Sequence, residues 1–137
     1  FFVGKVPLKA ALHVEVTPVD FNELSSKHSF EKSGQIRQRV MKARTIQYER
    51  YKETEGIYAN AQMSSKQLKE ICQISTASFA LLKAAMEKLN LSARAYDRIL
   101  KVSRTIADLA DSTDIEPAHL AEAIQYRSLD REGWGGV

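Results

Sequence analysis

Arg94 is the residue whose type and position most clearly suggest chemistry, because it stands in the first turn of a predicted helix. Ser92 is a good N-cap for that helix, since its hydroxyl can accept a hydrogen bond from an unpaired amide. Leu91 and Tyr96 have the spacing of a hydrophobic staple, and Asn90 suits a left-handed residue that ends a preceding helix. Free amides and the helix dipole favour an anion here, and a guanidinium adds a bidentate phosphate clamp. The pattern predicts an anion contact at Arg94, with a solvated arginine as the alternative.

A second set of cations lies on a helix that we expect to begin at Ser33 or Gly34 and to run to about Lys52. Most basic helices are solvated surfaces, but a basic helix is also a common footprint of nucleic-acid or nucleotide binding. Both interpretations stay open, together with a contact to another domain of the same protein. They concern Arg37, Arg39, Lys42 and Arg44, and Arg50 extends the same basic side, while the apolar side consists of Ile36, Val40, Ala43 and Tyr51.

The sequence offers no catalytic set and no metal site. Its histidines (His13, His28 and His119) are far apart and have no partner at metal-ligand spacing, so we interpret them as surface or capping residues. Cys72 falls on the apolar side of its helix and is interpreted as a core residue rather than a nucleophile. The phosphate-binding pattern G-x-x-x-x-G-K-[ST] does not occur. We therefore predict that this chain alone is not catalytic and binds no cofactor.

The composition fits one small domain that does not span a membrane. The 137 residues are 44% hydrophobic, which is enough for a core of ordinary size. The formal net charge of +3 permits an anionic partner without requiring one. A single cysteine excludes an intramolecular disulfide, and no apolar run is long enough to cross a bilayer. We expect a cytoplasmic protein with no membrane partner.

Four further helices are predicted at residues 64–72, 75–89, 92–111 and 116–128. Their starts combine a polar cap with an apolar residue before it, and Ser64 with Gln67 has the spacing of a capping box. The loops between them are short, so neighbouring helices should pack antiparallel in an all-α bundle. In the helix at 75–89 the predicted core stripe is Phe79, Leu82, Met86 and Leu89.

Three segments are distinguished along the chain: an N-terminal segment at 1–32, a helical domain at 33–131 and a flexible tail at 132–137. Alternation of apolar and polar side chains at 12–16 predicts a short half-buried strand that ends at Pro18. A lone strand cannot complete its own hydrogen-bond ladder. The strand must therefore pair within a dimer, lie on the helices, or belong to a sheet outside this chain.

Four runs of sequence resemble magnesium-chelatase-like AAA+ ATPases of the ComM/YifB type. Residues 36–47, IRQRVMKARTIQ, follow that family's I-R-x-R-V-x-x-A-R-x-x-Q helix, and residues 91–109, LSARAYDRILKVSRTIADL, are similar to its most recognisable C-terminal motif. Residues 119–127, HLAEAIQYR, are similar to its closing helix, and residues 12–16, LHVEV, to the strand that leads out of its ATPase core. The resemblance covers about residues 12–131. The family's arginine- and aspartate-containing run before the strand has no counterpart here, so no arginine finger is assigned.

The resemblance implies a C-terminal helical lid rather than a complete enzyme. In the family a conserved arginine called sensor 2 approaches the γ-phosphate of ATP, and that role carries over to Arg94. Arg98 and Arg104 also match the motif, and for them we favour packing or a subunit contact over a nucleotide contact. The implied partners are the AAA+ core of the same protein and neighbouring subunits of a hexamer. ATP and Mg²⁺ would be bound only by the full-length parent.

The substrate of such a motor is open between two classes. The ComM type implies work on DNA, the chelatase type implies metal insertion into a porphyrin, and the IQYR ending at 124–127 favours the former. A function of a different class is a free-standing helical module that binds nucleic acid or protein, and residues 75–128 also suit a histone-like arrangement. A phosphate-binding loop upstream of this chain would decide for the motor.

Overall fold

The protein is described by a computed structural model at residues 12, 14, 16, 18 and 30–128. No β-strand forms in this part of the chain, which confirms the all-α prediction, although one isolated parallel bridge joins Ile74 to Ile115. The described α-helices begin and end within two residues of their predicted bounds, whereas the short 3-10 helix was not predicted. They are α2 (Ser33–Tyr51), the 3-10 helix η1 (Asn60–Gln62), α3 (Ser65–Ile71), α4 (Thr76–Lys88), α5 (Ala93–Leu109) and α6 (Pro117–Ser128).

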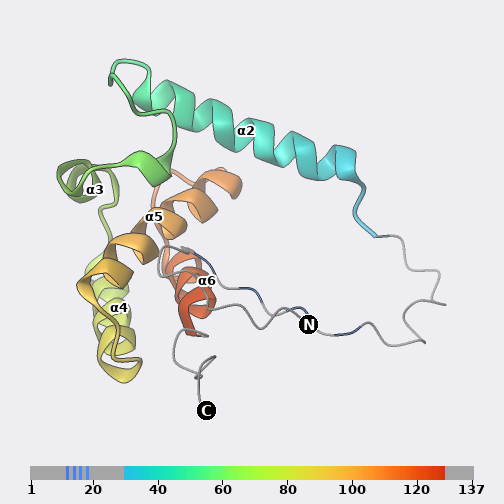
Figure 1. The fold of residues 1–137 in the computed structure, drawn as a ribbon. Helices are drawn as coiled ribbons and strands as arrows, with labels where there is room; N and C mark the ends of the chain where they lie inside the picture. The colour runs from blue at the N-terminus through green and yellow to red at the C-terminus, as the bar shows by residue number, and fades with distance from the viewer. Residues whose placement is uncertain (1–11, 13, 15, 17, 19–29, 129–137) are drawn as a thin grey trace, which may run out of the picture.

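α5 is the central element of the domain (Figure 1). It packs against α6, α2, η1 and α3, while α4 packs on α6. Ile99, Leu100 and Ala107 of α5 share one buried cluster with Leu82 of α4 and Leu120 of α6. Removing such side chains from water is the main favourable contribution to this packing. The position of α5 therefore determines how the other helices are presented.

The helix starts follow the predicted capping chemistry. The hydroxyl of Ser92 accepts a hydrogen bond from the amide of Ala95 at 3.3 Å. Ser64 and Gln67 form the expected capping box, with the amide of Ser64 donating to Oε1 of Gln67 at 2.9 Å. Asn90 has a φ of 47°, so it is the predicted left-handed residue between α4 and α5. Local sequence alone thus fixes where α3 and α5 begin. Within the described residues no helix is both long and apolar enough to cross a membrane.

The structure does not support the half-buried strand expected at 12–16. The residues described there lie in no strand, and their side chains are exposed, Val16 to 87%. A strand needs a neighbour for its backbone hydrogen bonds, and the described helices offer no sheet edge. His13 and His28, like the tail at 132–137, lie outside the described residues. The described residues of the N-terminal segment at 1–32 are Leu12, Val14, Val16, Pro18 and residues 30–32.

The predicted core stripe of α4 is only partly right. Leu82 is buried and Met86 packs partly buried against the core, but Phe79 is 52% exposed. Ser78 occupies the buried side of that turn instead. Successive residues of a helix point about 100° apart, so burying Ser78 against the domain turns Phe79 outward. The apolar spacing of α4 was correct, but the face that packs is rotated.

α2 extends beyond the other helices with its N-terminal half (Figure 1). Its buried residues all lie between Ala43 and Tyr51, where it packs against α5. Ile36 and Val40 were predicted to share this apolar side, yet both are exposed. Ile36 and Val40 are exposed because they lie in the first turns of α2, which have no described helix to pack against. α2 therefore presents a long exposed surface.

Candidate functional site

Arg94 is exposed at the N-terminal end of α5. It is the second residue of the helix and makes no hydrogen bond or ion pair with any residue in the range 30–128. Ser92 satisfies the amide of Ala95, whereas the earlier amides of the first turn have no acceptor within the helix. A guanidinium and free amides at one helix end can bind one anionic group together. The geometry thus leaves Arg94 available for the anion contact that the sequence predicts.

An apolar groove lies beside this end of α5. It encloses about 270 Å³ and is lined by Tyr96 of α5 together with residues of α4. Tyr96 follows Arg94 by two residues, so the two side chains point about 200° apart and the groove lies on a different face of α5 from the arginine. It supplies mainly apolar contact area. The residues from α4 are Phe79, Leu82, Lys83, Met86 and Glu87.

Arg98 lies one turn further along α5. It is half-buried and already has an interaction within the protein. The packing role that we favoured for it fits this position. A guanidinium that is half-buried in its own domain is less available to a phosphate than Arg94.

Arg104 is buried, with its side chain 5% exposed. Its Nε donates to Oδ1 of Asp108 at 3.1 Å. Its two terminal nitrogens donate to the backbone carbonyls of Thr113 and Ser112 at 2.8 and 2.6 Å. These bonds tie α5 to the loop that precedes α6. All three nitrogens are thus used inside the domain, and the geometry favours packing over a nucleotide contact for Arg104.

Asp108 is the centre of a buried polar cluster that joins α5 to α2. Its fully buried carboxylate accepts hydrogen bonds from Arg50 at 2.6 and 2.8 Å and from Asn60 at 2.8 Å, besides the one from Arg104. Asn60 also accepts a hydrogen bond from the hydroxyl of Tyr51 at 2.8 Å. Burial by itself would raise the pKa of the Asp108 carboxyl. The hydrogen bonds from Arg50 and Asn60 and the charges of both arginines outweigh burial and lower that pKa. The ionised carboxylate of Asp108 therefore has a structural role, because it holds α2 and α5 together.

Sequence analysis missed this cluster and placed Arg50 on the basic surface of α2. One signal was available, because Asp108 follows Arg104 by four residues, the spacing of an ion pair on one helix face. Both residues adjoin apolar positions of α5, and buried charges need partners. The third partner, Arg50, is 58 residues away from Asp108. Only the tertiary fold could identify it.

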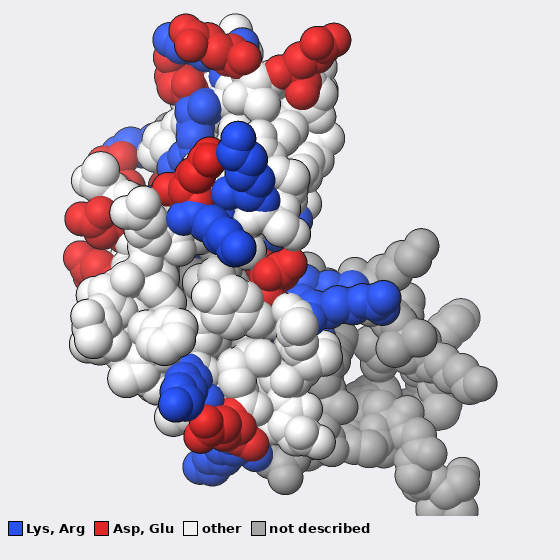
Figure 2. Space-filling model, turned by 90° about the vertical axis from the view of Figure 1, so that its left-hand side faces the viewer, with Lys and Arg blue, Asp and Glu red and all other residues white. Residues whose placement is uncertain are grey.

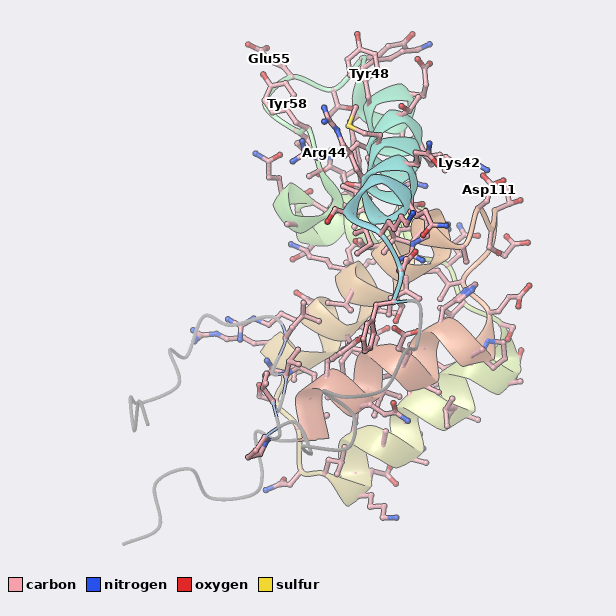
Figure 3. All side chains as sticks on the ribbon, turned by 90° about the vertical axis from the view of Figure 1, so that its right-hand side faces the viewer. Lys42, Arg44, Tyr48, Glu55, Tyr58 and Asp111 are labelled. Atoms are coloured by element: carbon pink, nitrogen blue, oxygen red, sulfur yellow. The ribbon has the colours of Figure 1, made fainter. Side chains whose placement is uncertain are left out.

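The candidate cations of α2 divide into paired and unpaired ones. Arg37 and Arg44 are exposed and form no ion pair with any described residue. Figure 3 shows Lys42 and Asp111 on one side of α2 and Arg44 on the other. Two of the four candidates therefore remain available to an external anion. The paired candidates are in the exposed ion pairs Arg39–Glu31 and Lys42–Asp111, each at 2.7 Å.

The two groups of cations do not form one site. α2 is joined to the far end of α5 through Asp108, which stands 14 residues after Arg94. At about 1.5 Å per residue this separation is about 21 Å along the helix axis. An anion at Arg94 and an anion on α2 would therefore be bound separately.

No continuous basic patch covers the face that carries α3 and α4 (Figure 2). Charges of both signs mix at the upper end of this face, and a broad uncharged area lies below them. A polyanion would find no extended positive potential here. Binding of an anion to this face would therefore depend on individual cations rather than on a continuous patch.

Cys72 and His119 have the structural roles that the sequence predicted. Cys72 is buried, and burial raises the pKa of its thiol to about 11. Nδ1 of His119 accepts a hydrogen bond from the amide of Glu116 at 3.1 Å, at the start of α6. Among the residues that the structure describes, no group of three or more His, Cys, Asp or Glu could hold a metal ion.

Comparison with known proteins gives a family match over most of the chain. Residues 30–127 match the family described as magnesium chelatase, subunit ChlI C-terminal. The competence protein ComM of Haemophilus influenzae is 46% identical over 101 residues, which are 74% of this chain and 19% of that protein. YifB of Escherichia coli, an uncharacterized protein, is 39% identical over the same shares. Mb2921c of Mycobacterium bovis, also uncharacterized, is 34% identical over 71% of this chain and 19% of its own length. The chain thus spans about a fifth of the length of these relatives.

Proposed function

Because the chain belongs to the magnesium chelatase, subunit ChlI C-terminal family, we propose that it is the lid of an AAA+ ATPase and that Arg94 is the sensor 2 residue of this lid. The nucleotide-binding core would lie in the remainder of the parent protein, since the matched region is only 19% of ComM or YifB. ATP and Mg²⁺ are then bound by the parent. The lid contributes a single arginine to that nucleotide.

The observation that carries this proposal is the availability of Arg94. It is exposed in the first turn of α5 without a partner among the described residues. The other two arginines of the same helix are engaged, Arg98 by an interaction within the protein and Arg104 by the carboxylate of Asp108 and two carbonyls. Of the three, Arg94 has the geometry that a phosphate contact requires.

The proposed mechanism is electrostatic. Arg94 meets ATP only when the lid docks against a core that carries nucleotide, either its own or that of a neighbouring subunit of a hexamer. Its fixed positive charge then stabilises negative charge as it shifts on the transferring γ-phosphate. A planar guanidinium can do this with two parallel hydrogen bonds, whereas an ammonium group acts only as a point charge. The lid would thereby couple the nucleotide state to the arrangement of subunits.

We propose DNA as the substrate of the parent motor. This follows from the ComM/YifB-like motifs at 36–47 and 91–109 and from the identity of 46% to the competence protein ComM. The alternatives are the lid of a true magnesium chelatase motor subunit and a free-standing helical module that binds nucleic acid or protein. The proposed location of the parent is the cytoplasm.

The test compares Arg94→Ala with the wild type in the full-length parent. We expect ATP turnover to fall by about 10- to 1,000-fold, the range for loss of one preorganised donor. Arg94→Lys should recover only part of it. The melting temperature of the lid should stay nearly unchanged, because an exposed arginine contributes little to folding. Steady-state phosphate release and thermal unfolding are measured on the same variants.

Lys66→Ala is the matched control, since Lys66 is likewise an exposed cation at the second position of a helix, α3. Its turnover should equal that of the wild type. Loss of folding in Arg94→Ala along with loss of turnover would show that Arg94 is structural. The 137-residue chain alone should release no phosphate from ATP, because it lacks a phosphate-binding loop.

A further inference from the structure

One exposed stripe of α2 combines cations with apolar and aromatic side chains. Arg37, Met41, Arg44 and Tyr48 follow one another at spacings of four, three and four residues, so they lie on one face of the helix. All four are exposed, Met41 to 52% and Tyr48 to 64%. They face away from Ala43, which packs inward. We call these four residues the α2 stripe.

The α2 stripe holds the unpaired cations of this helix. Arg39, Lys42, Arg50 and Lys52 each form an ion pair with a carboxylate of the described chain. Arg37 and Arg44 form none with the residues that the structure describes. They are seven residues apart, which is about 10 Å along the helix at about 1.5 Å per residue. Among the described residues, ion pairing thus leaves unpaired arginines on one face of α2 only.

A second exposed tyrosine stands beside this face. Tyr58 is 74% exposed and belongs to the loop after α2. Figure 3 shows Arg44 on the side of α2 that faces Tyr58, with Tyr48 further along the helix. Tyr48 and Tyr58 both line a hollow of about 300 Å³ whose other lining residues are Tyr51 and the loop at 52–57. Two aromatic rings therefore border one open depression, and one of them, Tyr48, lies one helical turn after the unpaired Arg44.

Exposed aromatic rings beside unpaired arginines fit one class of ligand best. Single-stranded nucleic acid offers phosphates to the cations and flat bases to the rings, and stacking does not depend on the sequence. A polyanion without bases would bind the arginines, but it would have no flat group to stack on the tyrosines. Neither tyrosine hydroxyl makes a hydrogen bond within the described part of the chain that would explain its place.

We propose that single-stranded nucleic acid binds along the α2 stripe, with phosphates at Arg37 and Arg44 and bases stacked on Tyr48 and Tyr58. This inference deepens the proposed role of the parent on DNA and rests on that part of the proposed function. It does not depend on Arg94, which lies at the other end of α5. Binding to one domain is weak and salt-dependent, because only two phosphates are contacted.

The acidic residues near the hollow set a limit to this affinity. Glu49 is paired with Lys52 at 2.9 Å. Glu53 and Glu55 line the hollow and are exposed, and Figure 3 shows Glu55 next to Tyr58. A carboxylate there repels a phosphate. Replacing Glu55 by glutamine should therefore strengthen binding, a direction that a purely structural role of the loop would not predict.

The experiment titrates the 137-residue chain against a fluorescein-labelled oligothymidylate at low and high salt. Arg44→Gln should weaken binding about 3- to 10-fold and lower the dependence of log K on log salt by about 0.7. Tyr48→Leu should weaken it by a similar factor through lost stacking. Glu55→Gln should strengthen it about twofold. Helical circular dichroism verifies that each variant is folded.

The matched controls carry the same chemical change at positions outside the α2 stripe. Arg39→Gln removes the same charge from the same helix, so any general electrostatic effect is equal and the excess in Arg44→Gln measures contact. Tyr126→Leu removes a tyrosine from α6, where its hydroxyl bonds to Glu122. Both controls should bind oligothymidylate within about twofold of the wild type, as expected for exposed charges that are screened by salt. Heparin serves as a polyanion without bases, and Tyr48→Leu should not affect its binding.

Three results would overturn the proposal. The first is no binding of oligothymidylate at low salt. The second is equal loss in Arg44→Gln and Arg39→Gln, which would show non-specific attraction. The third is that Tyr48→Leu has no effect while heparin competes fully, which would assign the α2 stripe to a base-free anion such as an acidic protein surface. ATP turnover of the parent and its loss in Arg94→Ala are measured separately, so failure here is distinguishable from failure of the proposed lid function.

Discussion

At the N-terminal end of α5, Arg94 is exposed with no partner among residues 30–128, whereas ten residues later Arg104 is buried with every side-chain nitrogen bonded. The two residues have the same side chain on the same helix. The difference lies in the carboxylates: Asp108, one turn after Arg104, is buried and bonded to it, whereas Asp97, three residues after Arg94, forms no ion pair with Arg94 in the described structure. The comparison teaches that an arginine in a motif is available for function only where the fold leaves its charge unmatched.

We call the C-terminal end of α5, where Arg104 and Asp108 are buried, the closed end, and the N-terminal end with Arg94 the open end. Substitutions should lower stability more at the closed end than at the open end. Asp108→Asn leaves the buried Arg104 and the half-buried Arg50 without a counter-charge, so we expect a loss of about 3 kcal/mol in the free energy of unfolding. Urea titration measures it.

Asp111→Asn is the matched control, because Asp111 also accepts a cation, Lys42, in an ion pair that is exposed. It should change stability by less than about 0.5 kcal/mol. Asparagine also tolerates the φ of 59° at this position. Equal effects of the two substitutions would show that burial does not distinguish these pairs and would remove the basis of the comparison.

The stabilisation that Asp108 provides at the closed end should also be lost in acid. The pKa of Asp108 is lowered in the folded state, so its contribution to stability is complete above the ordinary carboxyl pKa of about 4. The contribution is lost as the pH falls through the lowered folded pKa, because the unfolded chain then binds the proton more readily. Thermal unfolding between neutral and strongly acidic pH measures this. Asp108→Asn should be less sensitive than the wild type in the same range, and an equal slope would assign acid sensitivity to other carboxyls.

Truncation of a side chain at the open end should cost little stability. Phe79 borders the groove beside the N-terminal end of α5 and is 52% exposed. Phe79→Ala should cost less than about 1 kcal/mol, whereas a fully buried phenylalanine would cost about 3–5 kcal/mol. Leu82→Ala, in the same helix but buried, should cost about 2–5 kcal/mol. A large cost for Phe79→Ala in denaturant titration would mean that the groove is closed in solution and that the two ends are less different than they appear.

The parts of the fold that were predictable from the sequence are those set by neighbours along the chain. Ser64, Ser92 and Asn90 act within a few residues, so the helix starts were right, and the family resemblance is confirmed by the match over 30–127. The orientation of a helix about its own axis depends on what it packs against. That is why Phe79 was placed in the core although Ser78 is the buried residue.

The candidate site shows the same limit. The exposed first turn with Arg94 follows from Ser92 and its spacing, and sequence reasoning reached it. The paired state of Arg50 depends on Asp108, which is 58 residues away, and no local pattern of α2 shows it. Likewise the division of the α2 cations into paired and unpaired ones required the position of Asp111 in space. Charge counted along a helix therefore overestimates the charge that a ligand can reach.

The buried Cys72 can be used to measure local opening of the domain. It is the single cysteine of the chain, and its thiol, with a pKa of about 11, is shielded by the core where α3 ends. A thiol reagent can react with it only when that part of the domain opens transiently, so the labelling rate reports the free energy of opening. The native protein thus carries its own probe of local opening, and the effect of nucleic acid on that rate can be followed without introducing another cysteine.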